Sequence, residues 1–169
     1  MILPDNFTKL TFAEQTFVVS NLERVGRGLR PFVGITSKLN ATARSAAQNR
    51  VDPAPASAKI GQFAVMTFGS NWTANFGPLA ADYGWMYDDG YGSYNIDCSS
   101  PLASGCWAHR DVILSTYSNR PLLISGAGSQ KQNGLVSIAQ MFVGGEGPAP
   151  AFTYTWAQAL RHGADGGRR

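Results

Sequence analysis

The sequence predicts a single α+β domain in which helices cover a small antiparallel sheet. Two observations support this class: three segments with helical patterning occupy the first half of the chain, and two strand-like segments joined by a tight turn follow later. The chain has 169 residues, of which 44% are apolar, which suits one sizeable hydrophobic core better than two. We therefore expect one domain over residues 1–169, with flexible ends at 1–10 and 163–169.

The first predicted helix begins after Thr11. Thr11 and Glu14 have the spacing of a capping box, in which each side chain bonds the backbone amide of the other residue. Val18 and Leu22 continue an apolar face at helical spacing, and Gly28 is expected to stop the helix. These signals predict a helix that packs one face against the core.

A second helix is expected to begin at Thr36 or Ser37 and to end before Asp52. The positions that face the core are mostly small, which allows close packing. These positions are Leu39, Ala43, Ala46 and Ala47. The next segment, QFAVMTF at 62–68, alternates as a half-buried strand does and is expected to end before Gly69.

A third helix is expected to begin at Pro78, because the first turn of a helix does not need the amide hydrogen that proline lacks. Gly90 is expected to end it. We expect Leu79, Tyr83 and Met86 to point inward from this helix.

Two cysteines, Cys98 and Cys106, lie in a long segment, residues 90–108, that is rich in Gly, Ser and Pro. A disulfide between them would close a small loop and stabilise it by roughly 2–3 kcal/mol in the chain-entropy model. Two unrelated buried thiols are the alternative. A short helix, HRDVIL at 109–114, is expected to follow this loop.

The last third of the chain predicts a hairpin. RPLLISGAG at 120–128 and LVSIAQMFVGG at 135–145 have the composition of strands, and the pair Asn133 and Gly134 between them favours a tight turn. The segment FTYTWAQALRHG, 152–163, is expected to begin as a strand and to close with a short helix.

Several short stretches occur in an order that resembles a known family. They are NLERVGRGLRPFVGITSKLNATARSAAQ at 21–48, Trp85-Met86, HRDVIL at 109–114, LISGAG at 123–128 and IAQMFVGG at 138–145. Together they resemble bacterial domains of the CAP superfamily, which groups cysteine-rich secretory proteins, antigen 5 and pathogenesis-related proteins. The resemblance implies αβα layers around a cavity that commonly holds two histidines and two acidic residues, sometimes with a metal.

The chain departs from this family pattern at the cavity. His109 matches the later histidine of the family, but no histidine precedes it in the sequence. Ser70 and Tyr83 stand where the resemblance implies acidic residues, with Asp82 one position from the second. Because one histidine cannot hold zinc alone, we expect no bound metal, and we expect no cofactor.

The candidate catalytic residues are His109, Glu23 and Asp97. The ordinary pKa of histidine suits a general base near neutral pH. We expect His109 to pair with Glu23 and so tie the long loop to the first helix. A hydrolase would use His109 together with Glu23 or with a loop aspartate such as Asp97, whereas the alternative is a buried histidine with a structural role.

Carboxylates and aromatic residues interleave in YDDGYGSYNID at 87–97. This pattern suits glycoside hydrolysis, although an ordinary Asp-Gly turn or a calcium site has a similar composition. The predicted substrate-binding residues are Asn71, Trp72, Tyr83, Asp88, Asp89 and Trp107.

Several classes of protein are disfavoured. The net charge of +3 comes from scattered basic residues, so nucleic acid is an unexpected partner. No long apolar span predicts a transmembrane segment, and the opening residues predict a mature domain without a signal peptide. The sequence contains no G-x-S-x-G, P-loop or H-E-x-x-H motif. The charged fraction is only 15%, which together with the expected disulfide favours a secreted, extracellular protein.

Three functions remain. The first is a secreted CAP-like binding or interaction module with a His/acid cavity. The second is a hydrolase, with glycosidase preferred over peptidase, and the third is a lipid or sterol binder. The expected partners are accordingly a cell-wall or plant polysaccharide, or a lipid, and the chain is expected to be a monomer.

Overall fold

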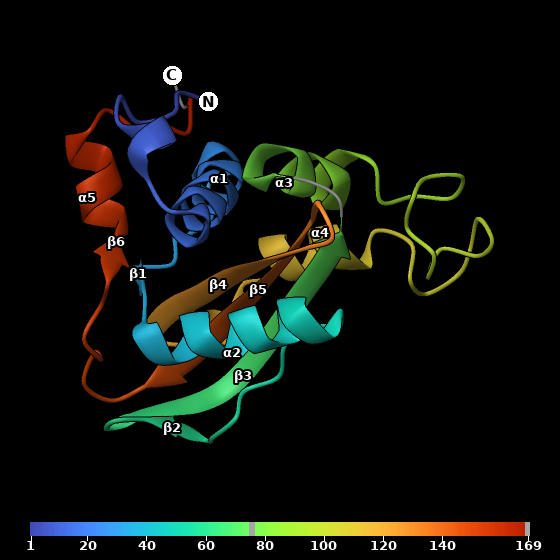
Figure 1. Cartoon of the computed structure of the whole chain (residues 1–169). Coiled ribbons are helices and arrows are strands. Elements are labelled where there is room, and N and C mark those ends of the chain that lie inside the picture. The colour runs from blue at the N-terminus through green and yellow to red at the C-terminus, as the bar shows by residue number, and fades with distance from the viewer. Residues whose placement is uncertain (75–76, 168–169) are drawn as a thin grey trace.

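The computed structural model describes residues 1–74 and 77–167, and it contains one six-stranded sheet (Figure 1). The strands are β1 Gly34–Ile35, β2 Lys59–Ile60, β3 Phe63–Ala74, β4 Leu122–Gln132, β5 Leu135–Glu146 and β6 Tyr154–Thr155. Their order in the sheet is β2-β3-β5-β4-β1-β6. β1 and β4 pair in parallel, and the other neighbouring strands pair antiparallel.

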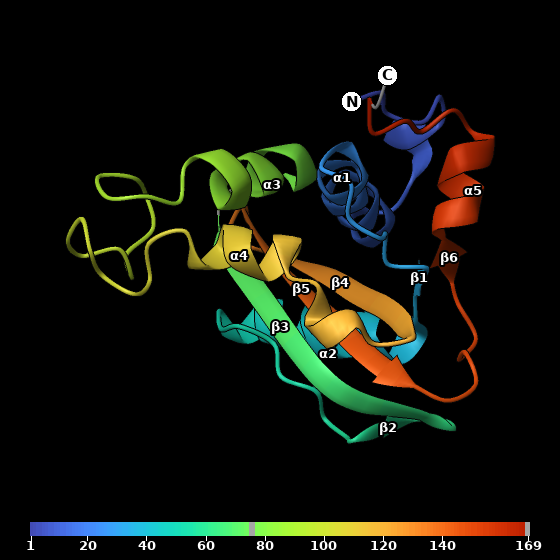
Figure 2. The same ribbon diagram turned by 180° about the vertical axis from the view of Figure 1, so that it is seen from behind.

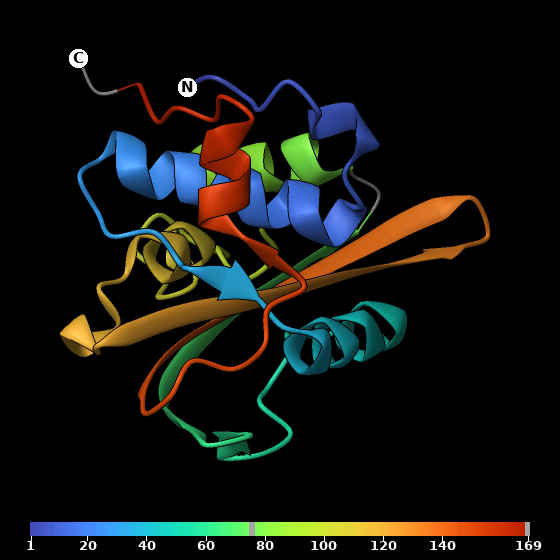
Figure 3. The same ribbon diagram turned by 90° about the vertical axis from the view of Figure 1, so that its left-hand side faces the viewer.

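Helices lie on both faces of this sheet. They are η1 Phe7–Lys9, α1 Phe12–Gly26, α2 Ser37–Asn49, α3 Pro78–Tyr87, α4 Ala108–Leu114, η2 Tyr117–Asn119 and α5 Trp156–Arg161. α2 covers one face, and α1, α3 and α4 lie on the other (Figures 1 and 2). Figure 3 shows α1 and α2 on opposite sides of β4 and β5. These αβα layers confirm the predicted α+β class.

The helix starts follow from local side-chain bonds. The capping box of Thr11 and Glu14 is present at α1, and the Thr36 side chain accepts the Leu39 amide at α2. Thr155 forms a second capping box at α5. α1 ends at Gly26, slightly earlier than the predicted stop. Because these bonds satisfy amides that the first turn leaves free, the starts could be predicted from sequence.

The predicted hairpin is also present. Asn133 and Gly134 have φ angles of 51° and 80°, as expected of a tight turn that needs left-handed backbone at both positions. β3 is longer than predicted and continues past Gly69 to Ala74, because it pairs with β5 along this whole length.

Alternation along β5 divides the core between the two faces. Ile138 and Phe142 pack in the cluster formed with α1, whereas Met141 and Val143 pack in the cluster formed with α2. Successive strand side chains point to opposite faces, so one strand serves both layers. The core therefore lies on both sides of β4 and β5.

Two of the three inward-facing predictions on α3 are wrong. Leu79 and Tyr83 are 52% and 61% exposed, whereas Met86 is fully buried as predicted. The buried side of α3 carries Asp82 and Trp85 next to Met86. The buried side of α3 was hard to predict because it carries an aspartate, and hydrophobic periodicity treats aspartate as a surface residue.

The first and last described segments lie side by side. The amide of Ile2 donates to the carbonyl of Asp165 at 2.7 Å, and the reverse bond is 3.0 Å. Residues 168 and 169 of the predicted flexible end 163–169 lie outside the described residues. Flexibility of either end remains a prediction. None of the described helices is long and apolar enough to cross a membrane.

Candidate functional site

The candidate site is built around an ion pair between Asp89 and His109. Asp89 lies two residues after α3, and His109 lies in the first turn of α4. The distance from His109 Nδ1 to Asp89 Oδ1 is 2.7 Å. The other carboxylate oxygen accepts the backbone amides of His109 and Arg110 at 3.0 and 3.3 Å. Asp89 is 1% exposed, so this buried carboxylate joins the end of α3 to the start of α4.

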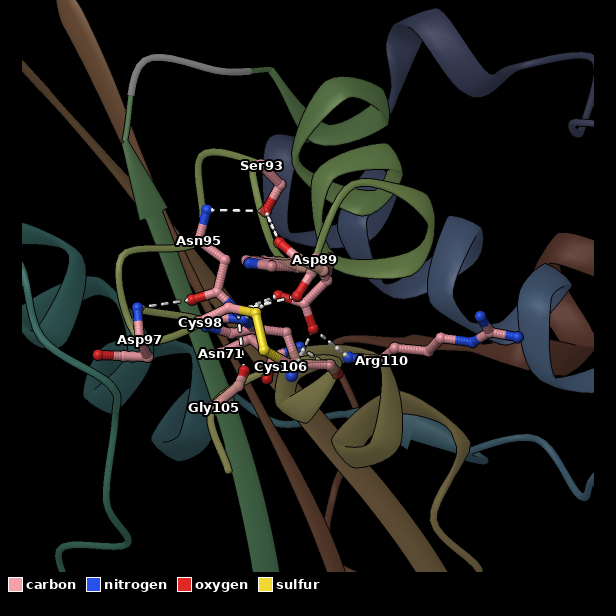
Figure 4. Close-up of polar contacts among 12 residues, drawn as sticks. Asn71, Asp89, Ser93, Asn95, Asp97, Cys98, Gly105, Cys106 and Arg110 are labelled. Atoms are coloured by element: carbon pink, nitrogen blue, oxygen red, sulfur yellow. Dashed lines mark hydrogen bonds and ion pairs between the residues drawn. A yellow bond between two sulfur atoms is a disulfide. The ribbon is translucent and has the colours of Figure 1, made fainter. Parts of the chain in front are cut away.

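Asn95 extends these contacts into the loop of residues 88–107 (Figure 4). Its side-chain amide donates to Asp89 Oδ1 at 2.7 Å and to the Gly105 carbonyl at 2.8 Å. Its side-chain oxygen accepts the Asp97 amide at 2.9 Å. The loop is thus held at its centre by one amide side chain.

The loop is also closed covalently. The predicted disulfide between Cys98 and Cys106 is confirmed. The next residue, Trp107, has a φ of 64°, which aromatic residues rarely adopt. The Trp107 amide donates to the Asp89 carbonyl at 2.9 Å, which holds the residue in this conformation.

Arg24 fixes the other end of α4. Its guanidinium donates to the carbonyls of Ile113 and Ser115 at 2.6 and 2.7 Å, and its Nε donates to the Arg30 carbonyl at 2.8 Å. The side chain is buried and lies over the Phe32 ring. Burial lowers the pKa of Arg24 to about 10, so the group remains protonated at neutral pH. Lysine could not reach these three carbonyls from one position.

Two further aspartates act on the imidazole through their charges. Asp97 comes from the loop, and Asp52 comes from the connection between α2 and β2. Burial alone would lower the pKa of His109, but the hydrogen bond and charge of Asp89, with the charges of Asp52 and Asp97, raise it above its ordinary value. Partial desolvation raises the pKa of the Asp52 carboxyl, against the lowering effect of His109. The imidazole therefore sits in a negative field.

The second ring nitrogen of His109 has no hydrogen-bond partner within residues 1–74 and 77–167. One nitrogen is thus oriented by a buried carboxylate, while the other is open on a partly exposed side chain. This arrangement can take or give a proton. Asn71, fully buried on β3, donates to the His109 carbonyl at 3.0 Å, and its side-chain oxygen has no partner in the described part of the chain.

The predicted pair between His109 and Glu23 is wrong. Glu23 forms a salt bridge with Arg27, the residue that follows α1, and both carboxylate oxygens accept from the Tyr87 hydroxyl at 2.9–3.0 Å. Arg27 also donates to this hydroxyl at 3.1 Å. The reason is local: Asp89 lies two residues after α3 and reaches His109, whereas Glu23 meets partners just after α1 and at the end of α3.

A buried polar chain that the sequence did not reveal crosses from α3 to the sheet. The Ser20 hydroxyl lies 3.5 Å from Asp82 Oδ1 and 2.8 Å from Gln140 Oε1, and Gln140 donates to Ser125 at 3.4 Å. Burial and the neighbouring Glu23 charge raise the pKa of Asp82 to about 8. A protonated Asp82 can donate to Ser20, which then donates to Gln140, so the proton completes the chain of bonds.

Exposed aromatic residues occur on α3 and on the loop of residues 88–107. Tyr83 and Tyr94 are 61% and 86% exposed, and Tyr91 and Trp107 are also exposed. The rings of Tyr83 and Tyr87 lie 5.7 Å apart. We call the exposed rings of Tyr83, Tyr87, Tyr91, Tyr94 and Trp107 the aromatic surface.

The remaining predicted site residues fall in different places. Asp88 is half-buried at the end of α3, and Asp97 is exposed in the loop. Trp72 packs beside the small residues of α2, and its indole donates to Ser137, so it lies on the other face of the sheet from His109. The structure brings together Asp89, His109 and Asn71, and it separates Trp72 from them. Their functional roles remain predictions.

Asp52 is the neighbour of His109 that sequence analysis missed. It lies 57 positions before the histidine, in a proline-containing connection with no motif around it. A negative charge acting across that separation leaves no local signal in the sequence. Only the placement of this connection beside Trp72 and the loop brings it close.

Two cavities, of about 290 and 350 Å³, lie away from this pair. The first lies between the start of α1, α2 and β4, and the second lies between the start of α2 and residues 148–151. Within the described ranges, no three His, Cys, Asp or Glu side chains are grouped so that they could hold a metal ion.

No protein-family model matches the chain, and a comparison with curated proteins found no match. Among solved structures, the chain is similar to venom allergen-like protein 4 of Schistosoma mansoni, with a TM-score of 0.47 and 14% sequence identity. The alignment covers 86% of this chain and 96% of that chain. A likeness of this degree does not assign the chain to a family, and the resemblance to CAP domains rests on the sequence motifs.

Proposed function

We propose that the chain is a secreted, CAP-like binding module that holds a polysaccharide on its aromatic surface. The observation that carries the proposal is the exposure of these aromatic rings on α3 and on a loop that is closed by a disulfide. Exposed apolar patches of this kind mark interaction sites in soluble proteins. The electron-rich faces of the rings suit the C–H groups of sugar rings, and the tyrosine hydroxyls suit their hydroxyl groups.

The loop that carries most of these rings is held in place before any ligand arrives. Asp89, Asn95 and the disulfide between Cys98 and Cys106 each fix it at a different point. A pre-ordered loop loses little conformational freedom on binding, so more of the contact energy appears as affinity.

Two observations support the CAP-like and secreted parts of the proposal. The motifs at 21–48, 109–114 and 138–145 occur in the order found in CAP domains, and the αβα layers agree with that resemblance. A disulfide persists in oxidising surroundings such as the outside of the cell.

The test is binding to insoluble plant and bacterial cell-wall polysaccharides. We expect the double substitution Tyr83→Ala and Tyr94→Ala to weaken binding by about tenfold or more. Phe68→Ala is the matched control, because Phe68 is 49% exposed but lies on β3. No binding by the unmodified chain, or equal loss in the control, would contradict the proposal.

A second candidate, a hydrolase, is favoured by the open nitrogen of His109 opposite its bond to Asp89. His109→Gln should then abolish hydrolysis of a bound polysaccharide or peptide while leaving binding intact. His162→Gln is the matched control, because the other histidine also pairs with an aspartate, Asp5, but at an exposed site. A general base works when neutral, so activity should rise with pH through the raised pKa of His109.

The third class, a lipid or sterol binder, has less support. Charged residues border both cavities: Glu14 and Arg44 line the first, and Lys38 lines the second. A site for an apolar ligand is lined predominantly by hydrophobic side chains.

A further inference from the structure

We infer that the polysaccharide held on the aromatic surface carries protonated amino groups, as a polymer of de-acetylated amino sugars does. This inference rests on the proposed function and names the chemical class of its ligand. It follows from the charge around the aromatic rings, which is opposite in sign to that of the whole chain.

The segment that carries the aromatic surface is acidic. Residues 78–111 contain five aspartates and one arginine, and because Asp82 is protonated near neutral pH, four ionised aspartates and one arginine give a net charge of −3, in a chain whose formal net charge is +3. Two of these aspartates, Asp82 and Asp89, are buried and have partners within the protein. The other three, Asp88, Asp97 and Asp111, reach solvent.

The exposed carboxylates are available to a ligand. Among residues 1–74 and 77–167, none of Asp52, Asp88, Asp97 and Asp111 forms a salt bridge. The Asp97 carboxylate points away from Asp89 in Figure 4. Asp52 and Asp97 act on one another and on His109 through their charges.

Two arginines of the chain already form cation–π contacts with rings of the aromatic surface. The Arg110 guanidinium lies 5.5 Å from the centre of the Trp107 ring, and the Arg27 guanidinium lies 5.8 Å from that of Tyr87. Arg27 is already neutralised by Glu23. Aromatic faces attract cations through their quadrupole, so ammonium groups are favoured both by the rings and by the carboxylates.

The combination discriminates between polymers. A neutral, N-acetylated polymer keeps the ring contacts but offers no cation, and a polymer of uronic acids meets like charge. A basic protein segment supplies cations but no sugar rings, so it can pair with the carboxylates but lacks the contacts that sugar rings make with the aromatic rings. The amino-sugar polymer is the ligand that matches rings and carboxylates together.

The experiment is calorimetric titration of the full chain with soluble hexamers of glucosamine, N-acetylglucosamine and galacturonic acid. At about pH 5.5 the amino groups are protonated and ordinary carboxylates are ionised. We expect glucosamine hexamer to bind about tenfold more tightly than the N-acetylated hexamer, with the galacturonic hexamer weakest. Raising the salt from about 50 to about 300 mM should shrink the preference to about threefold, because exposed charges are screened.

Substitutions then separate the rings from the charges. Asp88→Asn with Asp97→Asn should remove the preference for glucosamine, so that the glucosamine and N-acetylated hexamers bind with similar affinity. Asp5→Asn with Glu146→Gln is the control, because it removes two exposed acids elsewhere. Tyr83→Ala with Tyr94→Ala should weaken binding of both hexamers.

Each contrary result has a distinct meaning. Equal binding of all three hexamers, lost in the tyrosine variant, would overturn the inference and leave the proposed function standing. A glucosamine preference that survives Asp88→Asn with Asp97→Asn would also overturn it. Oligolysine that binds as tightly as glucosamine hexamer, independently of Tyr83 and Tyr94, would show recognition of charge alone. Failure of every hexamer to bind would remove the proposed function as well.

Discussion

The two faces of the central sheet are packed by different kinds of side chain. On the face covered by α2, Leu39 and Ala43 pack against glycines of β4, and the buried clusters are apolar. On the face covered by α1 and α3, polar and charged residues are buried between the helices and the sheet. These residues are Thr16, Ser20, Asn21, Glu23, Arg24, Asp82 and Gln140.

This difference assigns different tasks to the two faces. The α2 face is defined by size, since it leaves no room for larger side chains. The α1 face is defined by hydrogen bonds. It holds the end of α3 and the start of α4, which the loop of residues 88–107 connects. Changes in volume should therefore disrupt the first face, and changes in charge or hydrogen bonding should disrupt the second.

The largest effect is expected at Arg24 on the polar face. Arg24→Ala leaves three carbonyls without their donor, one of them fully buried, and opens a cavity, so we expect a loss of about 3–5 kcal/mol in the free energy of unfolding. Urea denaturation followed by tryptophan fluorescence measures it. Arg24→Lys keeps the charge and should recover only part of the loss. A fully stable alanine variant would show that α4 is held by other contacts.

The packing of the α2 face is tested at Gly126. A Cβ atom built there would lie 2.2 Å from Leu39 Cβ and 2.5 Å from the Leu39 carbonyl carbon. Gly126→Ala should therefore destabilise the protein by about 2–3 kcal/mol, measured by the same denaturation. Gly84→Ala is the control, because a Cβ there has no neighbour within 4 Å and alanine favours a helix. Similar behaviour of the two variants would argue against close packing of α2.

The polar face should also make stability depend on pH through Asp82. Its folded pKa of about 8 lies above the ordinary value of 3.8, so the folded state binds the extra proton between these values. Stability should then fall as the pH rises through this window, by about 2 kcal/mol between pH 5 and 7. Asp82→Asn should flatten this dependence. Parallel pH profiles for the two proteins would contradict a protonated Asp82.

The smallest effect is the coupling between Asp89 and His109. A double-mutant cycle with Asp89→Asn and His109→Ala should give about 1 kcal/mol of interaction energy. Because the pKa of His109 is raised, the charged part of this coupling is complete below the ordinary pKa of 6.5 and is lost as the pH rises through the folded value. Cycles measured at acidic and alkaline pH test this sign. Purely additive effects at both pH values would mean that the pair orients the side chains but adds no interaction energy.

Sequence reasoning predicted the fold where the determining interaction is local. Thr11 and Glu14 are three residues apart, and Asn133 and Gly134 are adjacent, so each signal lies within one short window. The Cys98–Cys106 disulfide also belongs to this group. Tyr83 was placed wrongly because its helix buries an aspartate, which only a partner on α1 makes possible.

The candidate site was harder to predict because its partners are far apart in sequence. His109 was identified from its motif, but its carboxylate partner depended on whether Glu23 or Asp89 reached it. Asp52 lies in the connection between α2 and β2, far from His109 in the sequence. Pairing between side chains that are distant in sequence depends on how whole helices, strands and connections pack, so no local sequence pattern predicts it.

The bridge between Ile2 and Asp165 has a consequence for the order of the chain. Because the first and last described segments are hydrogen-bonded neighbours, a short glycine-containing linker could join them, and the polypeptide could be opened at the turn of Asn133 and Gly134. Circular permutation of this kind is tolerated where termini lie close together and the new opening is an exposed turn. The permuted protein would keep every layer of the fold while β4 and β5 became its terminal strands.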